Sequence, residues 1–178
     1  MITTVVNLFG GPGVGKSTTA AGVFSLLKQR GVLCELAHEY AKDLCWEGNP
    51  RIAHQLSVLA EQAWRVERLM GKVKFVITDS PILLSAVYAQ QSSRLSSHQA
   101  DLIRALAGSL HRDMRTFNIL LERVKPYQSA GRYQDEDGAR ALDVDIRNVL
   151  RSSGVTVAEI PGDRDAAPYI ANLLTKEF

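Results

Sequence analysis

Short apolar runs alternate with amphipathic stretches along the whole chain. Five runs rich in β-branched or other apolar residues have the length of buried strands. These runs cover residues 3–9, 32–37, 73–78, 116–121 and 155–160. The intervening stretches carry apolar residues at intervals of three and four, as helices do. The alternation predicts an α/β domain whose parallel five-stranded sheet is covered by helices on both faces.

Start and stop signals bound the predicted helices. These cover residues 17–30, 41–46, 50–70, 82–90, 97–114, 135–153 and 166–176. Pro50 stands at the first turn of the third helix, where its missing N–H costs least. Ser96 or Ser97 has the side chain to cap the helix that follows. The polar stretch 122–134 contains Pro126 and Gly131, and this pattern predicts a loop or lid.

Length and composition limit the possible classes of protein. A chain of 178 residues predicts one domain, spanning 1–178, with a full core. A hydrophobic share of 46% argues against disorder, and no apolar run approaches a membrane span. Cys34 and Cys45 lie in no metal or redox spacing, which favours a reducing cytoplasm, bacterial or phage-infected. The net charge of +2 is too small to indicate an overall nucleic-acid footprint.

The segment 10–18, GGPGVGKST, fits G-x-x-x-x-G-K-[ST] between a predicted strand and a predicted helix. In this phosphate-binding loop (P-loop), backbone N–H groups surround an anion at the positive end of the helix dipole. We expect phosphate contacts from Gly11, Pro12, Gly13, Val14, Gly15, Lys16, Ser17 and Thr18. Lys16 would reach the β- and γ-phosphates, and the Ser17 hydroxyl would hold Mg²⁺. The alternative, a glycine-rich turn without a ligand, explains less of this context, so we predict a nucleoside triphosphate site for ATP.

Two acidic residues follow predicted strands, at the edge of a parallel sheet where ligands gather. Asp79 has the place of a metal-side acid, and it could also accept a proton from an attacking hydroxyl; capping a helix is the alternative. The residue after it is Ser80 rather than a second acid, which weakens the case for a hydrolytic motor. Glu39 would face the acceptor across the cleft, with helix electrostatics as the competing explanation.

Aromatic side chains near Glu39 suggest a wall for an acceptor. Tyr40 and Trp46 could stack on an acceptor ring, although packing at the core or rim explains Trp46 equally well. For Trp64, on the long predicted helix, packing is the favoured interpretation. Beyond the fifth predicted strand, Pro161 and Gly162 could line the adenine with backbone groups.

Arginine outnumbers lysine by 14 to 7, and eight arginines lie between Arg94 and Arg147. Most of these suit solvated helix faces. Arg123 and Arg132, however, bracket the predicted lid. Mobile arginines that close over a triphosphate neutralise charge during transfer and exclude competing water. A solvated basic loop is the alternative explanation for this pair.

Several of these segments together resemble the nicotinamide riboside kinase-like P-loop ATPases and kinases that occur widely among bacteriophages. The matching pieces are GGPGVGKST at 10–18, HEYAK at 38–42, ITDSP at 77–81, and KPY at 125–127 with Gly131-Arg132. Only the first is specific by itself; the others match in order and spacing, over nearly the whole chain. More broadly, the chain is similar to nucleoside and nucleoside-monophosphate kinases.

The resemblance implies a P-loop three-layer fold with the P-loop strand central in the sheet, Mg-ATP as donor, and an arginine-rich lid. It places Glu39 on the acceptor side and Asp79 on the metal side. Some phage relatives are linked to phosphorylating 5-hydroxymethyluracil in DNA. The expected activity is therefore transfer of a γ-phosphoryl group to a hydroxyl of a nucleoside-like acceptor, either a free nucleoside, a nucleotide or a base in DNA, by a monomer or homodimer.

Other functions remain open from the sequence. A DNA-acting kinase would need a groove for the backbone, which the arginines between Arg94 and Arg115 could supply. A regulatory or assembly ATPase would use the same P-loop without any small-molecule acceptor. A kinase outside nucleotide metabolism, of shikimate type, is a further alternative.

Overall fold

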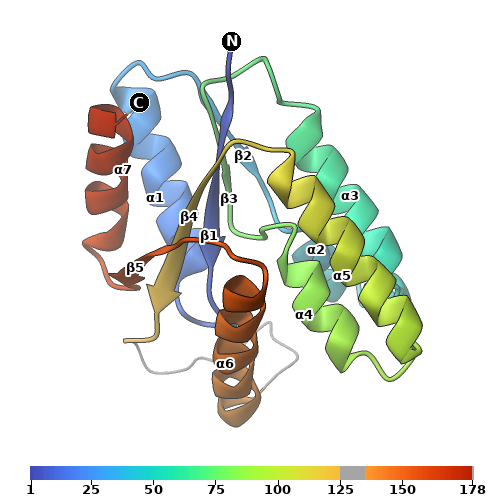
Figure 1. Cartoon of the computed structure of the whole chain (residues 1–178). Coiled ribbons are helices and arrows are strands. Elements are labelled where there is room, and N and C mark those ends of the chain that lie inside the picture. The colour runs from blue at the N-terminus through green and yellow to red at the C-terminus, as the bar shows by residue number, and fades with distance from the viewer. Residues whose placement is uncertain (125–134, 178) are drawn as a thin grey trace.

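A computed structural model describes residues 1–124 and 135–177 of the chain (Figure 1). Its five strands form one parallel sheet in the order β2-β3-β1-β4-β5. The strands are β1 (Thr4–Phe9), β2 (Cys34–Ala37), β3 (Phe75–Thr78), β4 (Thr116–Glu122) and β5 (Ala158–Pro161). The carboxyl end of each strand falls within one residue of the end of the corresponding predicted run. The predicted five-stranded parallel sheet is therefore confirmed.

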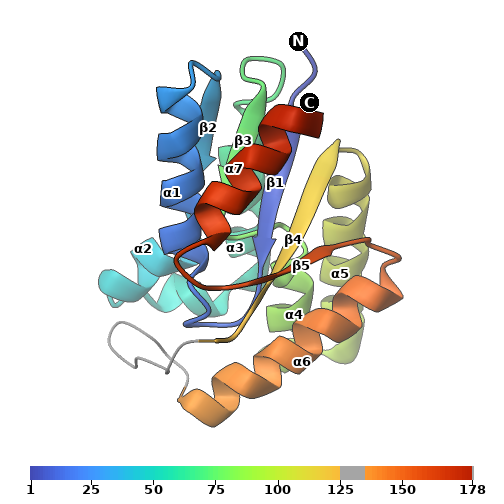
Figure 2. The ribbon, with the colours of Figure 1, turned by 90° about the vertical axis from the view of Figure 1, so that its left-hand side faces the viewer.

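Helices cover both faces of the sheet, as Figures 1 and 2 show. Those of the first half are α1 (Lys16–Gln29), α2 (Tyr40–Trp46), the short 3₁₀ helix η1 (Pro50–Ala53) and α3 (Gln55–Glu67). Those of the second half are α4 (Leu84–Gln91), α5 (Ser97–Arg112), α6 (Glu136–Ser152) and α7 (Ala166–Glu177). Buried side chains of α1 and α7 pack on one face of the sheet. Those of α3, α4, α5 and α6 form the core on the other.

The central strand β1 is fully buried and pairs with β3 on one side and β4 on the other. Phe9, at the end of β1, packs into the core formed with α3, α4, α5 and α6, whereas Leu8 packs with α1 and α7. The two faces of one strand therefore join both cores. Because every strand is parallel, the loops that follow the strands gather at one edge.

The segment 50–70, predicted as one helix, is divided. Pro50 begins η1, and the Asn49 side chain accepts a hydrogen bond from the Arg51 N–H. The backbone then leaves helical geometry at His54, and α3 starts at Gln55. The apolar periodicity of 50–70 continues through the break, so hydrophobic pattern alone did not reveal it.

Trp64 was expected to pack, but its side chain is 59% exposed. The buried face of α3 is made by Val58, Leu59, Gln62, Ala63 and Val66, and Trp64 lies outside that face. The prediction was wrong because it weighed residue type above helical position. In the described residues, no helix is both long and apolar enough to cross a bilayer.

The α5 helix begins with a capping box. The Ser96 hydroxyl accepts from the Gln99 N–H at 3.2 Å, and the Gln99 side chain accepts from the Ser96 N–H at 2.9 Å. Of the two serines proposed as caps, Ser96 therefore caps α5. Two N–H groups that have no partner within the helix are satisfied in this way.

Replacing Ser96 by Ala is expected to lower the free energy of unfolding by about 1 kcal/mol, because the cap and its reciprocal bond are both lost. Calorimetry should show a melting temperature lower by roughly 2–4 °C. Ser97→Ala, one residue inside the helix, is the matched control and should melt close to wild type. Equal effects of the two substitutions would contradict the assigned cap.

Candidate active site

The P-loop connects β1 to α1 at the carboxyl edge of the sheet. Gly10, Gly13 and Gly15 all have positive φ, at 137°, 87° and 104°. Side chains rarely adopt such backbone angles, so these positions favour glycine. Gly15 precedes the first residue of α1, and no side chain caps this helix end. The free N–H groups of the first turn therefore remain for an anionic ligand.

Lys16, the first residue of α1, folds back onto the P-loop. Its Nζ donates to the Gly10 carbonyl at 2.7 Å and to the Gly11 carbonyl at 3.0 Å. Burial lowers the pKa of the ammonium, although nearby carboxylates, of which Glu39 has the largest effect, oppose this shift. A polyphosphate at the loop would give this partly desolvated cation a stronger partner than two neutral carbonyls.

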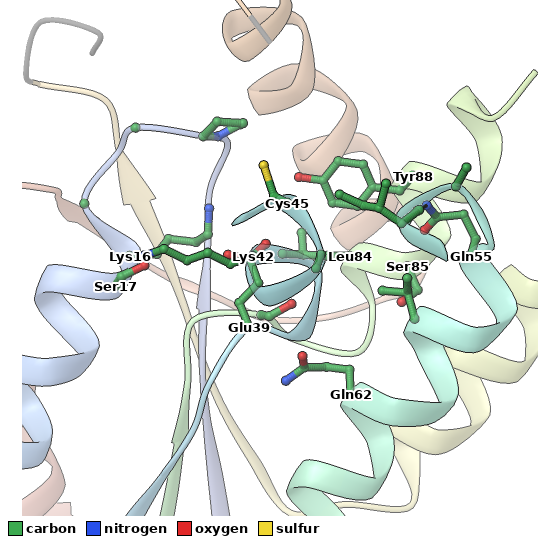
Figure 3. Close-up of a pocket in the computed structure, with 18 of the residues that line it drawn as sticks. Lys16, Ser17, Glu39, Lys42, Cys45, Gln55, Gln62, Leu84, Ser85 and Tyr88 are labelled. Atoms are coloured by element: carbon green, nitrogen blue, oxygen red, sulfur yellow. Dashed lines mark hydrogen bonds between the residues drawn. The ribbon is translucent and has the colours of Figure 1, made fainter. Parts of the chain in front are cut away.

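Beside the P-loop, a cavity of about 510 Å³ extends toward α3 and α4 (Figure 3). Lys16 and Ser17 lie at one end, and Gln55, Ser85 and Tyr88 lie at the other. Apolar side chains of α2, η1, α3 and α4 complete the walls, among them Ala41, Cys45, Ile52, Val58 and Leu84. Burial raises the pKa of the Tyr88 hydroxyl, so this group is a neutral hydrogen-bonding group of the wall. The cavity suits an apolar ring with a few polar atoms.

Glu39 lies in the wall between these two ends. It immediately precedes α2, where an acidic side chain ordinarily caps the helix, yet it makes no capping bond. Gln62 of α3 takes that part instead, because its Oε1 accepts from the Tyr40 N–H at 3.0 Å. The Glu39 side chain therefore lines the cavity instead of capping the helix. Burial is the main cause that raises its pKa, and Asp79 adds to this, while Lys16 opposes it.

Gln62 itself is buried and lines the same cavity. With its oxygen bound to the Tyr40 N–H, the orientation of its amide is defined. The Nε2 group has no hydrogen-bond partner among the described residues. An unpaired buried donor is costly and points to a functional constraint on this side chain.

The predicted aromatic contacts of α2 differ in outcome. The Tyr40 ring lies against the Arg65 guanidinium, with 5.0 Å between the ring centre and Cζ. The Arg65 guanidinium therefore covers one face of the Tyr40 ring. Trp46 is 72% exposed, so it does not pack in the core. Its side chain lines a second cavity, on the α1 side of α2.

The second cavity, of about 350 Å³, brings together the two residues expected at the metal. Ser17 and the buried Asp79 both line it, and Glu39 lines it as well. A hydroxyl and carboxylates are the hard oxygen donors that Mg²⁺ prefers. Among the described residues no three acidic, histidine or cysteine side chains form a metal cluster. Mg²⁺ usually keeps several waters and takes phosphate oxygens as further ligands.

Arg123, expected as a mobile arginine of the lid, has a buried side chain that is only 7% exposed. Its Nε donates to Asp143 Oδ2 at 2.8 Å, and its Nη2 approaches the Ala139 carbonyl at 3.5 Å. Both partners belong to α6. Arg123 is therefore held beside the P-loop in this structure, which differs from the expectation of a mobile side chain. Arg132, and with it most of the predicted lid, lies outside the described residues.

Close packing surrounds the P-loop on its other side. A Cβ atom on Gly162 would clash with the Val14 carbonyl and would lie 2.8 Å from the Glu122 carbonyl. The Gly162 N–H donates to that Glu122 carbonyl at 2.9 Å. Glycine at this position thus allows the loop after β5 to touch the P-loop. The adenine contact expected from Pro161 and Gly162 stays a prediction.

Four functional candidates were not predicted from the sequence: Asp143, Gln62, Ser85 and Tyr88. All lie on helices. Asp143 and Gln62 belong to amphipathic stretches, where polar side chains usually face solvent. The signal that marked Glu39, Asp79 and Arg123 was a position just after a strand, and residues inside helices lack that signal. Only the turned-in position of Gln62, at i+4 from Val58 and i−4 from Val66, offered a signal in the sequence.

Comparison with known proteins agrees with this fold. A family model described as an AAA domain matches residues 5–166, which is most of the chain. The protein therefore belongs to this family of AAA domains. No curated protein is significantly similar in sequence.

Solved structures of nucleotide-bound proteins share the fold. Deoxyadenosine kinase from M. mycoides with bound dATP aligns over 97% of this chain and 100% of its own, with a TM-score of 0.66 and 15% identity. NadR in complex with NAD and AMP-PNP aligns over 98% of this chain and 49% of its own, with a TM-score of 0.71 and 17% identity. The chain thus has a P-loop kinase-like α/β fold, and it spans about half the length of NadR.

The raised pKa of Glu39 predicts a cost in stability at neutral pH. A folded state that favours the protonated form loses stability as pH rises through the unfolded pKa of about 4.3. Glu39→Gln, which cannot ionise, should therefore melt above wild type near pH 7, and the difference should shrink toward pH 4. Thermal melts across this range measure the effect, with Glu67→Gln at the exposed end of α3 as control. A Gln variant that is less stable at neutral pH would contradict this prediction.

Proposed function

We propose that the protein is an ATP- and Mg²⁺-dependent kinase that transfers the γ-phosphoryl group to a hydroxyl of a nucleoside-like acceptor. The observation that carries the proposal is Glu39, a half-buried carboxyl in the wall of the cavity into which the P-loop opens. A P-loop alone binds a triphosphate. A P-loop beside a partly enclosed, largely apolar cavity with its own acid also supplies a place for an acceptor.

Residues of the chain divide the work of transfer among them. The P-loop amides and Lys16 hold the donor phosphates, and Ser17 with Asp79 would hold Mg²⁺, which neutralises phosphate charge. Glu39 would orient the acceptor hydroxyl and take its proton. Asp79, which like Glu39 and Asp143 lies near Lys16, is the alternative base. The hydroxyl oxygen forms a bond to the γ-phosphorus as the bond from that phosphorus to the β-bridging oxygen breaks. The products are ADP and a phosphorylated acceptor.

The proteins with a similar fold support a nucleoside-like acceptor, because their structures hold dCMP, dATP, or NAD with AMP-PNP. A free nucleoside, a nucleotide and a 5-hydroxymethylpyrimidine in phage DNA all fall within this class. In Figure 3 the far end of the cavity presents Gln55, Ser85 and Tyr88, which are neutral polar groups suited to the edge of a ring. Arg123 and Arg132 remain the arginines proposed to stabilise the transferred charge.

A second candidate is a regulatory or assembly ATPase without a small-molecule acceptor. Membership of the family of AAA domains supports this candidate. Such a protein would hydrolyse ATP at a rate that no nucleoside or DNA changes and that a protein partner stimulates. The acceptor cavity beside the P-loop favours the kinase.

Lys16→Ala is expected to remove nearly all turnover while the fold persists, because the ammonium that neutralises the β- and γ-phosphates is lost. ADP release in the presence of an acceptor is the measurement, and circular dichroism verifies the fold. Removing divalent cations with EDTA should stop wild-type turnover, and added Mg²⁺ should restore it. Lys72→Ala, on the loop before β3, is the control substitution. Full activity of the Lys16→Ala variant would refute the assignment.

A screen with γ-labelled ATP should place label on a nucleoside-like acceptor. Nucleosides, nucleotides and DNA that contains 5-hydroxymethylpyrimidine form the panel, and chromatography locates the label. Increasing salt separates the outcomes, because binding to a DNA backbone weakens steeply with salt whereas binding of a neutral nucleoside does not. Label released only as inorganic phosphate, whatever the acceptor, would favour the ATPase.

A further inference from the structure

A single carboxylate, that of Asp143 in α6, joins the P-loop to Arg123. Its Oδ1 accepts from the Gly11 N–H at 2.7 Å, and its Oδ2 accepts from Arg123 Nε at 2.8 Å. Each oxygen therefore has its own donor. The side chain of Asp143 is about one-quarter exposed, whereas that of Arg123 is almost fully buried. Bonds between charged groups in such partly dry surroundings are stronger than those at the surface.

The three groups are packed closely enough to fix one another. A Cβ atom on Gly11 would clash with Asp143 Oδ1 and would lie 2.8 Å from the Ala139 carbonyl. It would also lie 3.2 Å from Arg123 Nη2. The guanidinium thus lies directly against the first residues of the P-loop. Both charges also act on Lys16: Asp143 raises the pKa of its ammonium and Arg123 lowers it.

The chain segments that meet at Asp143 are far apart in sequence. Gly11 follows β1, Arg123 follows β4, and Asp143 lies in the second turn of α6. The carboxylate bonds directly to both Gly11 and Arg123 and so holds the guanidinium against the P-loop. An arginine held in advance contributes more to binding a phosphate than one that must be ordered when the ligand arrives.

We propose that Asp143 is a positioning residue that holds Arg123 against the P-loop and so directs this arginine to the phosphates of the donor nucleotide. The inference rests on the proposed function, because it assumes that the P-loop binds ATP. It assigns to α6 a part in donor binding. It also gives Arg123 a fixed place at the donor rather than one that depends on a moving lid.

The chemistry of the side chain suggests a sharp substitution. Asn has the shape of Asp but only one acceptor oxygen, so Asp143→Asn can serve either the Gly11 N–H or Arg123 Nε, not both. We expect its affinity for Mg²⁺ with the non-hydrolysable analogue AMP-PNP to fall about tenfold, measured by calorimetry. Asp145→Asn makes the same change two residues further along α6, where the carboxylate pairs with Gln91. This control should bind as wild type.

A double-mutant cycle separates positioning from a merely structural role. Removing Asp143 alone leaves a buried arginine without its carboxylate, which lowers stability as well. Arg123→Met combined with Asp143→Asn removes both charges and should recover much of the lost melting temperature. If Asp143 acts through Arg123, the two single variants and the double variant should all bind AMP-PNP about tenfold more weakly than wild type.

Three results would overturn the inference. One is wild-type affinity in Asp143→Asn, and another is wild-type affinity in the double variant, which would show a purely structural pair. The third is independent, multiplicative losses, near a hundredfold in the double variant, which would show that Asp143 does not act through Arg123. In each case AMP-PNP still binds the wild-type protein, so the proposed kinase function would stand. If the wild-type protein binds no AMP-PNP, both proposals fall together.

Discussion

The position of β1 at the centre of the sheet is the constraint on which the site depends. Because β1 pairs with β3 and β4 in parallel, the loops after all three strands emerge at one edge and side by side. The P-loop therefore has Asp79 on one flank and Arg123 on the other. A sheet with another strand order would contain the same residues, but it would separate the P-loop from the charged side chains of Asp79 and Arg123.

Charge balance at this edge explains the odd features of individual residues. Lys16 is partly desolvated and held by neutral carbonyls, and Glu39 is a half-buried acid that makes no capping bond. The Gln62 amide donor has no partner among the described residues. Each arrangement costs stability by itself. Together they describe a site organised for ligands, whose phosphates and hydroxyl would supply the missing partners. Stability given up at a functional site in this way is common in enzymes.

Much of the fold was predictable from the sequence because each strand carries a dense apolar run that ends at a turn signal. The positions of the P-loop, Glu39 and Asp79 at the carboxyl edge of the sheet were predictable, because each comes just after a strand. The break at His54 was not, since the apolar period continues across it. Nor was the pairing of Asp143 with Gly11 and Arg123, because it depends on how α6 packs against two loops that lie more than 100 residues apart. Local pattern cannot convey such packing.

The chain has two tryptophans, and they lie in different surroundings. Trp64 projects from the outer side of α3, whereas the indole of Trp46 borders the hollow shared by Ser17 and Asp79. Emission from Trp46 will respond when that hollow gains charge or loses water, while emission from Trp64 supplies a constant background. The protein thus carries a natural optical reporter beside its P-loop, and occupancy there can be followed in real time without any attached dye.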